Sequence, residues 1–274
     1  MAPGALDGLR VLSFEARRAE ELAGMLARHG ASVTRAPALR ETHLPESPAA
    51  HDLARRLETG DIQTVILMTG VGTRALAAAV AASCPDFPRR LARATIIARG
   101  PKPLAALREL GVDGAHPVPT PHTWRETLAV VDALGAAAGR GVAVQEYGVP
   151  NPALLEGLRQ RGARVLAVPV YRWALPDDTG PLRTGVSALT RGEADVAVFT
   201  NGAQVEHLFR VAADAAALRA GLGRTVVASV GPVCTEVLEA HGVHPDLEAS
   251  PPKMGPLVAL IAERARTVLA AKRA

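Results

Sequence analysis

Short runs of β-branched and aliphatic residues alternate along this chain with longer Ala- and Leu-rich segments, in which apolar positions recur at helical spacing. Strands that alternate with amphipathic helices predict an α/β fold, in which the helices that connect parallel strands cover the sheet. We expect strands at residues 10–14, 31–36, 64–68, 94–98, 142–146, 164–170, 195–199 and 225–229, and helices at 18–29, 51–58, 73–82, 152–160, 182–190 and 203–211, with another beginning near Pro103.

The second half of the chain repeats the order of landmarks in the first half. Thr69 and Thr200 each follow an apolar run, and the offset between them is nearly half the length of the chain. An offset this long indicates a duplicated domain, because solenoid units repeat every ~20–50 residues. We expect two flavodoxin-like parallel-sheet lobes, with the proline-rich residues 116–122 as the boundary between the copies. Further pairs with the same or nearly the same offset are Gly100-Pro101 with Gly231-Pro232, Gly111-Val112 with Gly242-Val243, and Gly30 with Gly162.

Composition narrows the class of ligand. Of the 274 residues, 48% are hydrophobic and only 3% aromatic, and the formal net charge is +4. Few aromatics argue against a nucleic-acid partner that is bound by base stacking, so an anionic small molecule is the better candidate. The histidines show no metal-binding spacing, so we expect no bound metal.

The sequence contains two cysteines, Cys84 and Cys234. Reduced thiols are favoured over a disulfide between them, although both alternatives remain open. Residues 1–10 lack the apolar core of a signal peptide, and no run approaches 18 apolar residues. We expect a cytoplasmic protein that does not bind membranes.

Four turns between a strand and a helix carry the candidate binding residues. In an open parallel sheet such turns lie at the carboxyl ends of the strands, where unpaired helix N–H groups favour a carboxylate or phosphate. The same residue types also cap helices without touching a ligand, and that alternative stays open for each of them. The candidates are Thr69, Gly70, Gly72 and Thr73; Gly100 and Lys102; Thr200, Asn201, Gly202 and Gln204; and Gly231, Pro232, Cys234 and Thr235.

One of these turns also matches a dinucleotide-binding pattern. Residues 70–75 have the form G-x-G-x-x-A after an apolar run. The pattern lies on a middle strand, and the next strand ends at Ala98-Arg99, where an acidic partner for the ribose is expected. We therefore disfavour a nicotinamide cofactor.

Tyr171 is the candidate for acid catalysis. It ends the expected strand at 164–170 and precedes Arg172, so a phenol and a guanidinium lie at a junction between elements. A half-buried aromatic that anchors this junction is the competing interpretation. The chain shows no G-x-S-x-G elbow and no residue beside Cys234 that would activate a thiol.

Together these residues resemble the uroporphyrinogen-III synthase family over residues 9 to about 262. The family cyclises hydroxymethylbilane, a linear tetrapyrrole, to uroporphyrinogen III. The segments that carry the resemblance are Arg17-Arg18-Ala19-Glu20 with Leu22 and Gly30, Thr69-Gly70-Val71-Gly72, Gly100 with residues 102–111, Pro169-Val170-Tyr171, residues 195–201, Ser229-Val230-Gly231-Pro232 and Gly242.

The resemblance implies one lobe of residues 1–37 with 172–274 and an inserted lobe of residues 38–171, joined by a two-strand linker. It implies a cofactor-free lyase that binds hydroxymethylbilane in the cleft between its lobes, with Tyr171 as the acid and Arg17 among the binding residues. We expect a monomer. The chain departs from the family at Val233-Cys234, where hydroxyl side chains are common. This departure leaves open a second hypothesis, a non-catalytic sensor of tetrapyrroles or other anions with the same fold.

Overall fold

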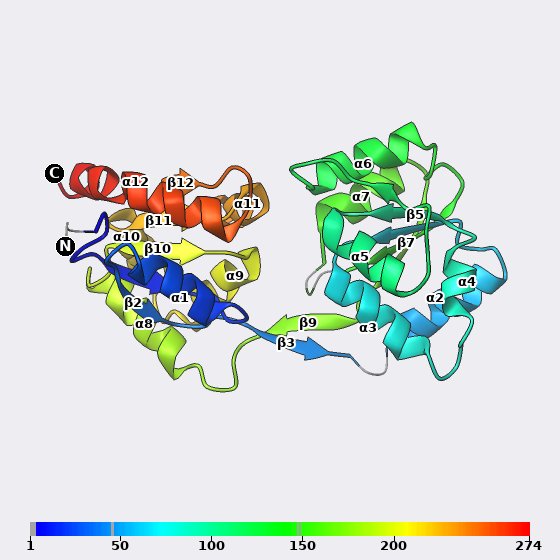
Figure 1. The fold of residues 1–274 in the computed structure, drawn as a ribbon, viewed down its shortest axis with the longest axis horizontal. Coiled ribbons are helices and arrows are strands. Elements are labelled where there is room, and N and C mark those ends of the chain that lie inside the picture. Colours follow the sequence, from blue (N-terminus) through cyan, green and yellow to red (C-terminus); the bar gives the residue numbers. More distant parts are fainter. Residues whose placement is uncertain (1–3, 45–46, 147, 149) are drawn as a thin grey trace. The chain divides into compact units, whose positions relative to one another are not determined.

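The computed structural model describes residues 4–44, 47–146, 148 and 150–274 (Figure 1). They form two compact α/β units. Unit 1 consists of Met1–Arg40 and Ala174–Ala274, and unit 2 consists of Glu41–Trp173. Each unit contains a five-stranded parallel sheet, which confirms the predicted fold class.

The sheet of unit 1 has the strand order β12-β11-β10-β1-β2. Its strands are β1 (Arg10–Ser13), β2 (Ser32–Arg35), β10 (Val196–Phe199), β11 (Val226–Ser229) and β12 (Leu247–Glu248). Its helices are α1 (Ala19–Ala27), α8 (Gly180–Thr190), α9 (Gly202–Val211), α10 (Ala215–Gly223), α11 (Pro232–Ala240) and α12 (Met254–Arg273).

Side chains of unit 1 alternate between two buried layers, because successive residues of a strand point to opposite faces of the sheet. Val196 and Val198 of β10 belong to the core layer with α1 and α12. Ala197 and Phe199 belong to the layer formed with α8, α9, α10 and α11. Helices on both faces explain why the central strand β10 is apolar throughout and shows no alternation with polar residues.

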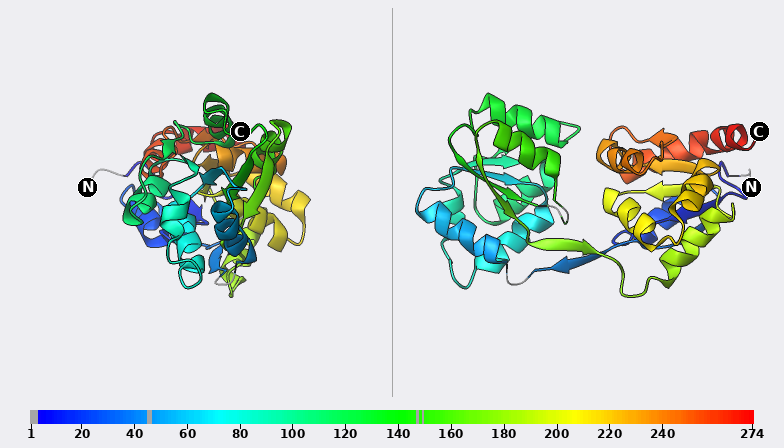
Figure 2. Two further views of the ribbon diagram at one scale, coloured as in Figure 1. Left: turned by 90° about the vertical axis from the view of Figure 1, so that its right-hand side faces the viewer. Right: turned by 180° about the vertical axis from the view of Figure 1, so that it is seen from behind.

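The sheet of unit 2 has the order β6-β5-β4-β7-β8. One face packs against α2, α3, α4 and α5, and the other packs against α6 and α7 (Figure 2). Its strands are β4 (Thr64–Leu67), β5 (Thr95–Ala98), β6 (His116–Pro117), β7 (Gly141–Gln145) and β8 (Arg164–Val168). Its helices are α2 (Pro48–Glu58), α3 (Gly70–Val80), α4 (Phe87–Leu91), α5 (Pro101–Glu109), α6 (Trp124–Ala133) and α7 (Pro152–Gln160).

Strands β3 (Arg40–His43) and β9 (Tyr171–Ala174) form the antiparallel two-strand linker that was predicted. Their first residues are related by the same offset as Thr69 and Thr200, and so are the first residues of β1 and β7, and of β5 and β11. The duplication therefore extends through the linker. The two repeats exchange their first strands, because β1 of the first repeat pairs with β10 of the second and β7 of the second pairs with β4 of the first.

Three details differ from the sequence predictions. Residues 116–122 do not mark the boundary between the copies, since β6 (His116–Pro117) is related by the repeat offset to β12 (Leu247–Glu248) and pairs with β5 inside unit 2. Tyr171 begins β9, because the strand expected to run to residue 170 ends at Val168, before Pro169. Helices α3 and α5 start at Gly70 and Pro101, earlier than expected, so the turn residues belong to the first helical turns.

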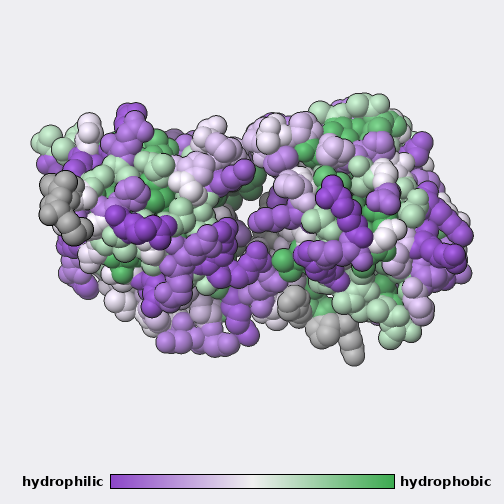
Figure 3. Space-filling model, viewed as in Figure 1, coloured by the Kyte–Doolittle hydropathy of each residue, from purple (hydrophilic) through white to green (hydrophobic). Residues whose placement is uncertain are grey.

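Figure 3 shows hydrophilic side chains over much of the visible face of both units. Within the described residues, no helix has both the length and the apolarity needed to cross a membrane. Cys84 and Cys234 are both free and buried, in unit 2 and unit 1 respectively.

Because unit 2 contains all five strands of its sheet, we expect a fragment of residues 41–173 to fold cooperatively by itself. A fragment of residues 174–274 lacks β1 and β2, and we expect it to fold only when a peptide of residues 1–40 is added. Circular dichroism and thermal unfolding of the separate and mixed fragments measure both expectations. Cooperative unfolding of the 174–274 fragment alone would contradict them. The lobe limits 1–37 with 172–274 and 38–171 remain a prediction. Unfolding measurements on fragments that end at those residues would test it.

Candidate functional site

The strand order locates one binding position in each unit. In unit 1 the strands follow the flavodoxin-like order 2-1-3-4-5, which reverses between β1 and β10. In unit 2 the corresponding reversal lies between β7 and β4. Ligands of open α/β sheets bind outside the carboxyl ends of the strands at this reversal, where the two connections leave in opposite directions. The turns at Thr200 and Thr69 follow β10 and β4 at these positions.

In unit 1, Thr200 is held by a polar network. The Gln204 side chain accepts from the Thr200 N–H at 2.8 Å, and its amide nitrogen donates to the Thr200 hydroxyl at 2.8 Å. The Thr200 hydroxyl donates to a carboxylate oxygen of Glu15. Glu15 lies two residues after Ser13, the last residue of β1. Asn201 caps α9 by accepting from the Ala203 N–H at 2.9 Å. Buried Gln204 therefore organises the turn, and the Thr200 hydroxyl, Asn201 and Gly202 remain partly exposed.

In unit 2, the turn at Thr69 is organised by Gln145, which comes from a strand and not from the helix that follows the turn. The Gln145 side chain, at the end of β7, accepts from the N–H groups of Met68 and Thr69 at 3.2 and 3.3 Å. The Thr69 hydroxyl caps α3 by accepting from the Gly72 N–H at 3.0 Å. Thr73 is buried, and its hydroxyl donates to the Thr69 carbonyl at 2.9 Å. Thr73 thus stabilises the helix end and is not exposed to a ligand.

Packing explains the G-x-G pattern of this turn. A Cβ on Gly72 would lie 2.0 Å from the Gln145 amide nitrogen, and a Cβ on Gly70 would lie 2.6 Å from the Lys102 carbonyl oxygen. Both glycines are therefore required so that α3 can approach β7 and α5 closely. A dinucleotide is not needed to account for them.

Tyr171 lies beside the Thr69 turn. Its hydroxyl is 3.2 Å from the Thr69 hydroxyl, and either group could be the donor. The ring is 2% exposed, belongs to the core of unit 2 and makes an edge contact with Trp173. Tyr171 is as buried as a purely structural aromatic residue would be, but its hydroxyl lies at the candidate site.

The second turn of each unit flanks these positions. Gly100 (φ +91°) precedes α5 in a conformation that favours glycine, and exposed Lys102 lies in the first turn of that helix. In unit 1, a Cβ on Gly231 would lie 2.5 Å from Pro252, and Pro232 begins α11. Exposed Arg17 lies between β1 and α1. The candidates thus form two groups, one in each unit.

Cys234 does not supply a nucleophile. The thiol is 2% exposed, and burial raises its pKa to about 12, so it stays protonated. The Thr235 hydroxyl, one residue later, lies 3.0 Å from the Ser229 hydroxyl and within hydrogen-bond reach of the Glu248 carboxylate, and it can donate to one of them at a time. The hydroxyl pair Ser229 and Thr235 therefore provides polar groups next to Cys234.

Two glutamates at these positions were missed by the sequence predictions. Glu15 and Glu146 follow the first strands of the two repeats, β1 and β7, and are related by the repeat offset. The Glu15 carboxylate accepts from the Thr200 hydroxyl and from the Arg18 N–H at 3.0 Å. Burial raises the pKa of Glu146, which is 8% exposed. The offset that identified Thr69 and Thr200 would also have identified this pair.

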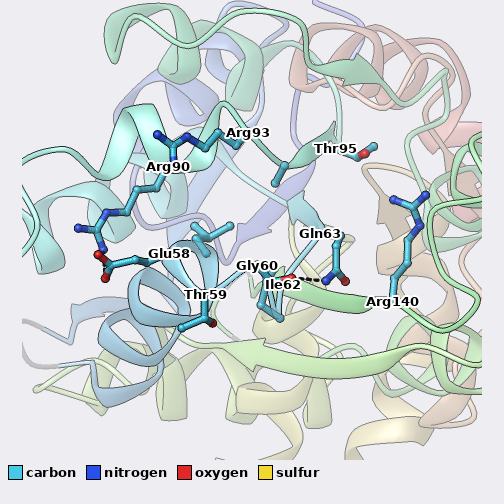
Figure 4. A pocket seen from close by; sticks show the side chains of 11 residues that line it. Glu58, Thr59, Gly60, Ile62, Gln63, Arg90, Arg93, Thr95 and Arg140 are labelled. Atoms are coloured by element: carbon cyan, nitrogen blue, oxygen red, sulfur yellow. Dashed lines mark hydrogen bonds and ion pairs between the residues drawn. The ribbon is translucent and has the colours of Figure 1, made fainter.

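A hollow described in unit 2 lies elsewhere. It has a volume of about 450 Å³ and is lined by the ends of α2 and α4 and the starts of β4 and β5 (Figure 4). Helix C-termini carry partial negative charge, so the arginines here have a structural explanation. Arg90 pairs with Glu58 at 2.7 Å and with Asp86 at 3.0 Å. This hollow is at the amino edge of the sheet, opposite the candidate turns, and we do not assign the substrate to it.

Among the described residues, no group of His, Cys, Asp and Glu is arranged to hold a metal ion. The chemistry available at the carboxyl edges includes hydroxyls, a phenol, the carboxyl groups of Glu15, Glu146 and Glu248, helix N-termini and the cations Arg17 and Lys102. These groups suit binding of an anionic molecule and transfer of protons.

Comparisons with known proteins agree with this fold. The sequence matches the family described as uroporphyrinogen-III synthase HemD over residues 20–259. A solved structure of a mutant uroporphyrinogen III synthase from Thermus thermophilus is 32% identical, with a TM-score of 0.75 over 95% of this chain and 100% of that chain. A putative uroporphyrinogen-III synthase from Methanothermobacter thermautotrophicus is 28% identical over 75% of this chain and 78% of its own length. Uncharacterized protein YjjA of Bacillus subtilis is 28% identical over 94% and 96% of the two chains.

The raised pKa of Glu146 predicts how stability changes with pH. Between the unfolded-state pKa, about 4.3, and the higher folded-state pKa, the folded protein binds more protons than the unfolded chain. This group therefore makes the protein less stable as pH rises through that window. E146Q removes the effect, so the Tm difference between E146Q and the parent should grow from pH 4 to neutrality, by about 2–4 °C for each kcal/mol.

The capping residue Glu126 provides a control of opposite sign. Burial raises its pKa, but hydrogen bonds from the Thr123 hydroxyl at 2.5 Å and N–H at 2.8 Å outweigh burial and hold the pKa low. Its contribution to stability is present above the unfolded-state pKa and lost as pH falls. E126Q should be less stable than the parent at neutral pH, with a difference that shrinks in acid. A pH-independent effect of E146Q would contradict the prediction for Glu146.

Proposed function

Because the chain belongs to the uroporphyrinogen-III synthase family, we propose that it cyclises hydroxymethylbilane to uroporphyrinogen III, with inversion of ring D and loss of water. The observation that carries the proposal is the family match across both units, 20–259, together with an anion-suited turn at the strand reversal of each sheet. The reaction needs no resident cofactor, because the pyrroles of the substrate stabilise the cation that forms when its hydroxyl leaves.

Orientation is the main task of such an enzyme. The substrate is a flexible chain with eight carboxylates, and ring D must attack through its substituted carbon. Holding it in one curl is worth up to roughly 7–11 kcal/mol in favourable intramolecular reactions. The N-termini of α3 and α9 and the cations Arg17 and Lys102 are groups that suit carboxylates.

We assign Tyr171 to the departure of the substrate hydroxyl. Its phenol is neutral near pH 7 and can donate a hydrogen bond or a proton. Its contact with Thr69 fixes the hydroxyl beside a turn that binds substrate in this proposal. We further propose a monomeric, cytoplasmic enzyme.

A non-catalytic sensor of tetrapyrroles or other anions is the second candidate. Val233 and buried Cys234 favour it, because they stand where hydroxyl side chains are common in the family. The adjacent hydroxyls of Ser229 and Thr235 weigh against it.

Incubation of the protein with freshly prepared hydroxymethylbilane, followed by separation of the uroporphyrinogen isomers, decides between the two. We expect type III to form at a rate proportional to protein concentration. Formation of the spontaneous type I isomer alone would refute the enzymatic proposal. Tight binding without turnover would support the sensor.

Tyr171→Phe tests the role of the phenol. The ring still packs against Trp173, so we expect the unfolding temperature to change little. Turnover should fall by about 10-fold to 100-fold, at or below the low end of the range for acid catalysis. Thr73→Val is the comparison within the same turn, because it removes a buried hydroxyl that bonds to the backbone. Unchanged turnover in Tyr171→Phe would assign the tyrosine to packing alone.

A further inference from the structure

Glu146 is a largely buried residue whose carboxyl group has no hydrogen-bond partner among the described residues, although its oxygens are not fully enclosed. It follows β7 directly and is 8% exposed. Its own N–H donates to the Val168 carbonyl at 3.1 Å, but within the described residues no hydrogen bond or ion pair reaches its side-chain carboxylate. Burying a carboxyl group without a partner costs stability, so a residue that only packs here would be better uncharged.

At the equivalent position of the other repeat, the carboxylate has hydrogen-bond partners. Glu15 accepts hydrogen bonds from the Thr200 hydroxyl, the Arg18 N–H and, at 3.4 Å, the Gln204 amide. In unit 2 the corresponding turn residue, Thr69, bonds instead to Tyr171 and Gly72. One strand position thus carries a partnered carboxylate in unit 1 and, among the described residues, an unpartnered one in unit 2.

The backbone places Glu146 beside the segment that carries Tyr171. The Glu146 N–H bonds to Val168, three residues before Tyr171, and Gly148 forms a parallel bridge with Arg172. Gln145 connects the same strand end to Thr69, whose hydroxyl contacts the Tyr171 phenol. The chain on either side of Glu146 is therefore tied to both residues at the candidate site of unit 2.

We propose that Glu146 is a catalytic residue that carries the proton of the cyclisation, as acid first and as base afterwards. This role rests on the proposed function. Burial without a charged partner keeps the carboxyl group protonated to higher pH, which suits a group that must start the cycle as an acid.

In this proposal Glu146 gives up one proton and takes one back during each reaction cycle. In the first step the C–O bond of the hydroxymethyl group breaks with its electron pair on oxygen, and the Glu146 proton completes a water molecule, while Tyr171 donates a hydrogen bond to the same oxygen. The substrate is then a cation beside a new carboxylate, which stabilises it electrostatically. After ring D has attacked, fragmented and rejoined, the cyclised cation loses a proton to that carboxylate. All four pyrroles are then neutral and aromatic, and Glu146 is protonated again.

Glu146→Gln, Glu146→Ala and the control Glu156→Gln test the proposal in the full-length protein. Glu156 is an exposed glutamate of α7 in the same unit and lies outside the carboxyl edge of the sheet. Turnover of hydroxymethylbilane to the type III isomer, KM and thermal unfolding are measured for each variant. Turnover by Glu146→Ala is also followed with added formate, a small carboxylic acid that can occupy the space left by the side chain.

We expect Glu146→Gln to fold and to lose about 10²–10⁴-fold in kcat, with KM within about threefold of the parent. Glu156→Gln should match the parent. Formate should accelerate Glu146→Ala and leave the parent unchanged. A Glu146→Gln variant with kcat within about threefold of the parent, or a folded Glu146→Ala variant that formate does not accelerate, overturns the role. Because the parent is assayed in parallel, absence of type III product from the parent identifies a failure of the proposed function instead.

Discussion

Pairing between strands of different repeats is the interaction on which this molecule depends. Val11 of β1 pairs with Val196 of β10, and Val65 of β4 pairs with Ala143 of β7. Each pair joins the first repeat to the second near the middle of a sheet. Neither repeat can complete a sheet by itself, and the reversal of strand order, where ligands of such sheets bind, lies at these two pairs.

Much of the fold could be predicted from the sequence because its signals are local and repeated. Apolar runs such as residues 65–68 and 196–199 have the length and the β-branched content of strands buried on both faces, and the constant offset between paired landmarks reveals the duplication. The boundary at residues 116–122 was wrong for a physical reason. His116–Pro117 is short and exposed as an edge strand, so its residues have the composition of a linker although they pair with β5.

The candidate site could be predicted only where residues follow a strand and begin a helix. Thr69 and Thr200 have that local signature. Gln145 does not, because its importance arises from the placement of β7 beside β4, which is known only once the strand exchange is known. Glu146 carries one sequence signal, its repeat offset from Glu15. The role of Gln145 is also specific to one repeat, since the corresponding amide in unit 1 comes from Gln204 on a helix. The equivalent N–H groups of Thr69 and Thr200 thus bond to side chains from unrelated positions. Gly72 is required because the side chain used in unit 2, Gln145, leaves no room for a Cβ there.

The strand exchange also has a consequence during protein synthesis. The whole of unit 2 lies in the chain between the partners Val11 and Val196, and every strand of unit 2 has been made once Trp173 has emerged from the ribosome. At about 5–20 residues per second, β1 waits on the order of 10–40 s for β10. Strand β1 can pair with β2 soon after both have been made, but its other edge, at the centre of the unit 1 sheet, has no partner in the nascent chain until β10 is made.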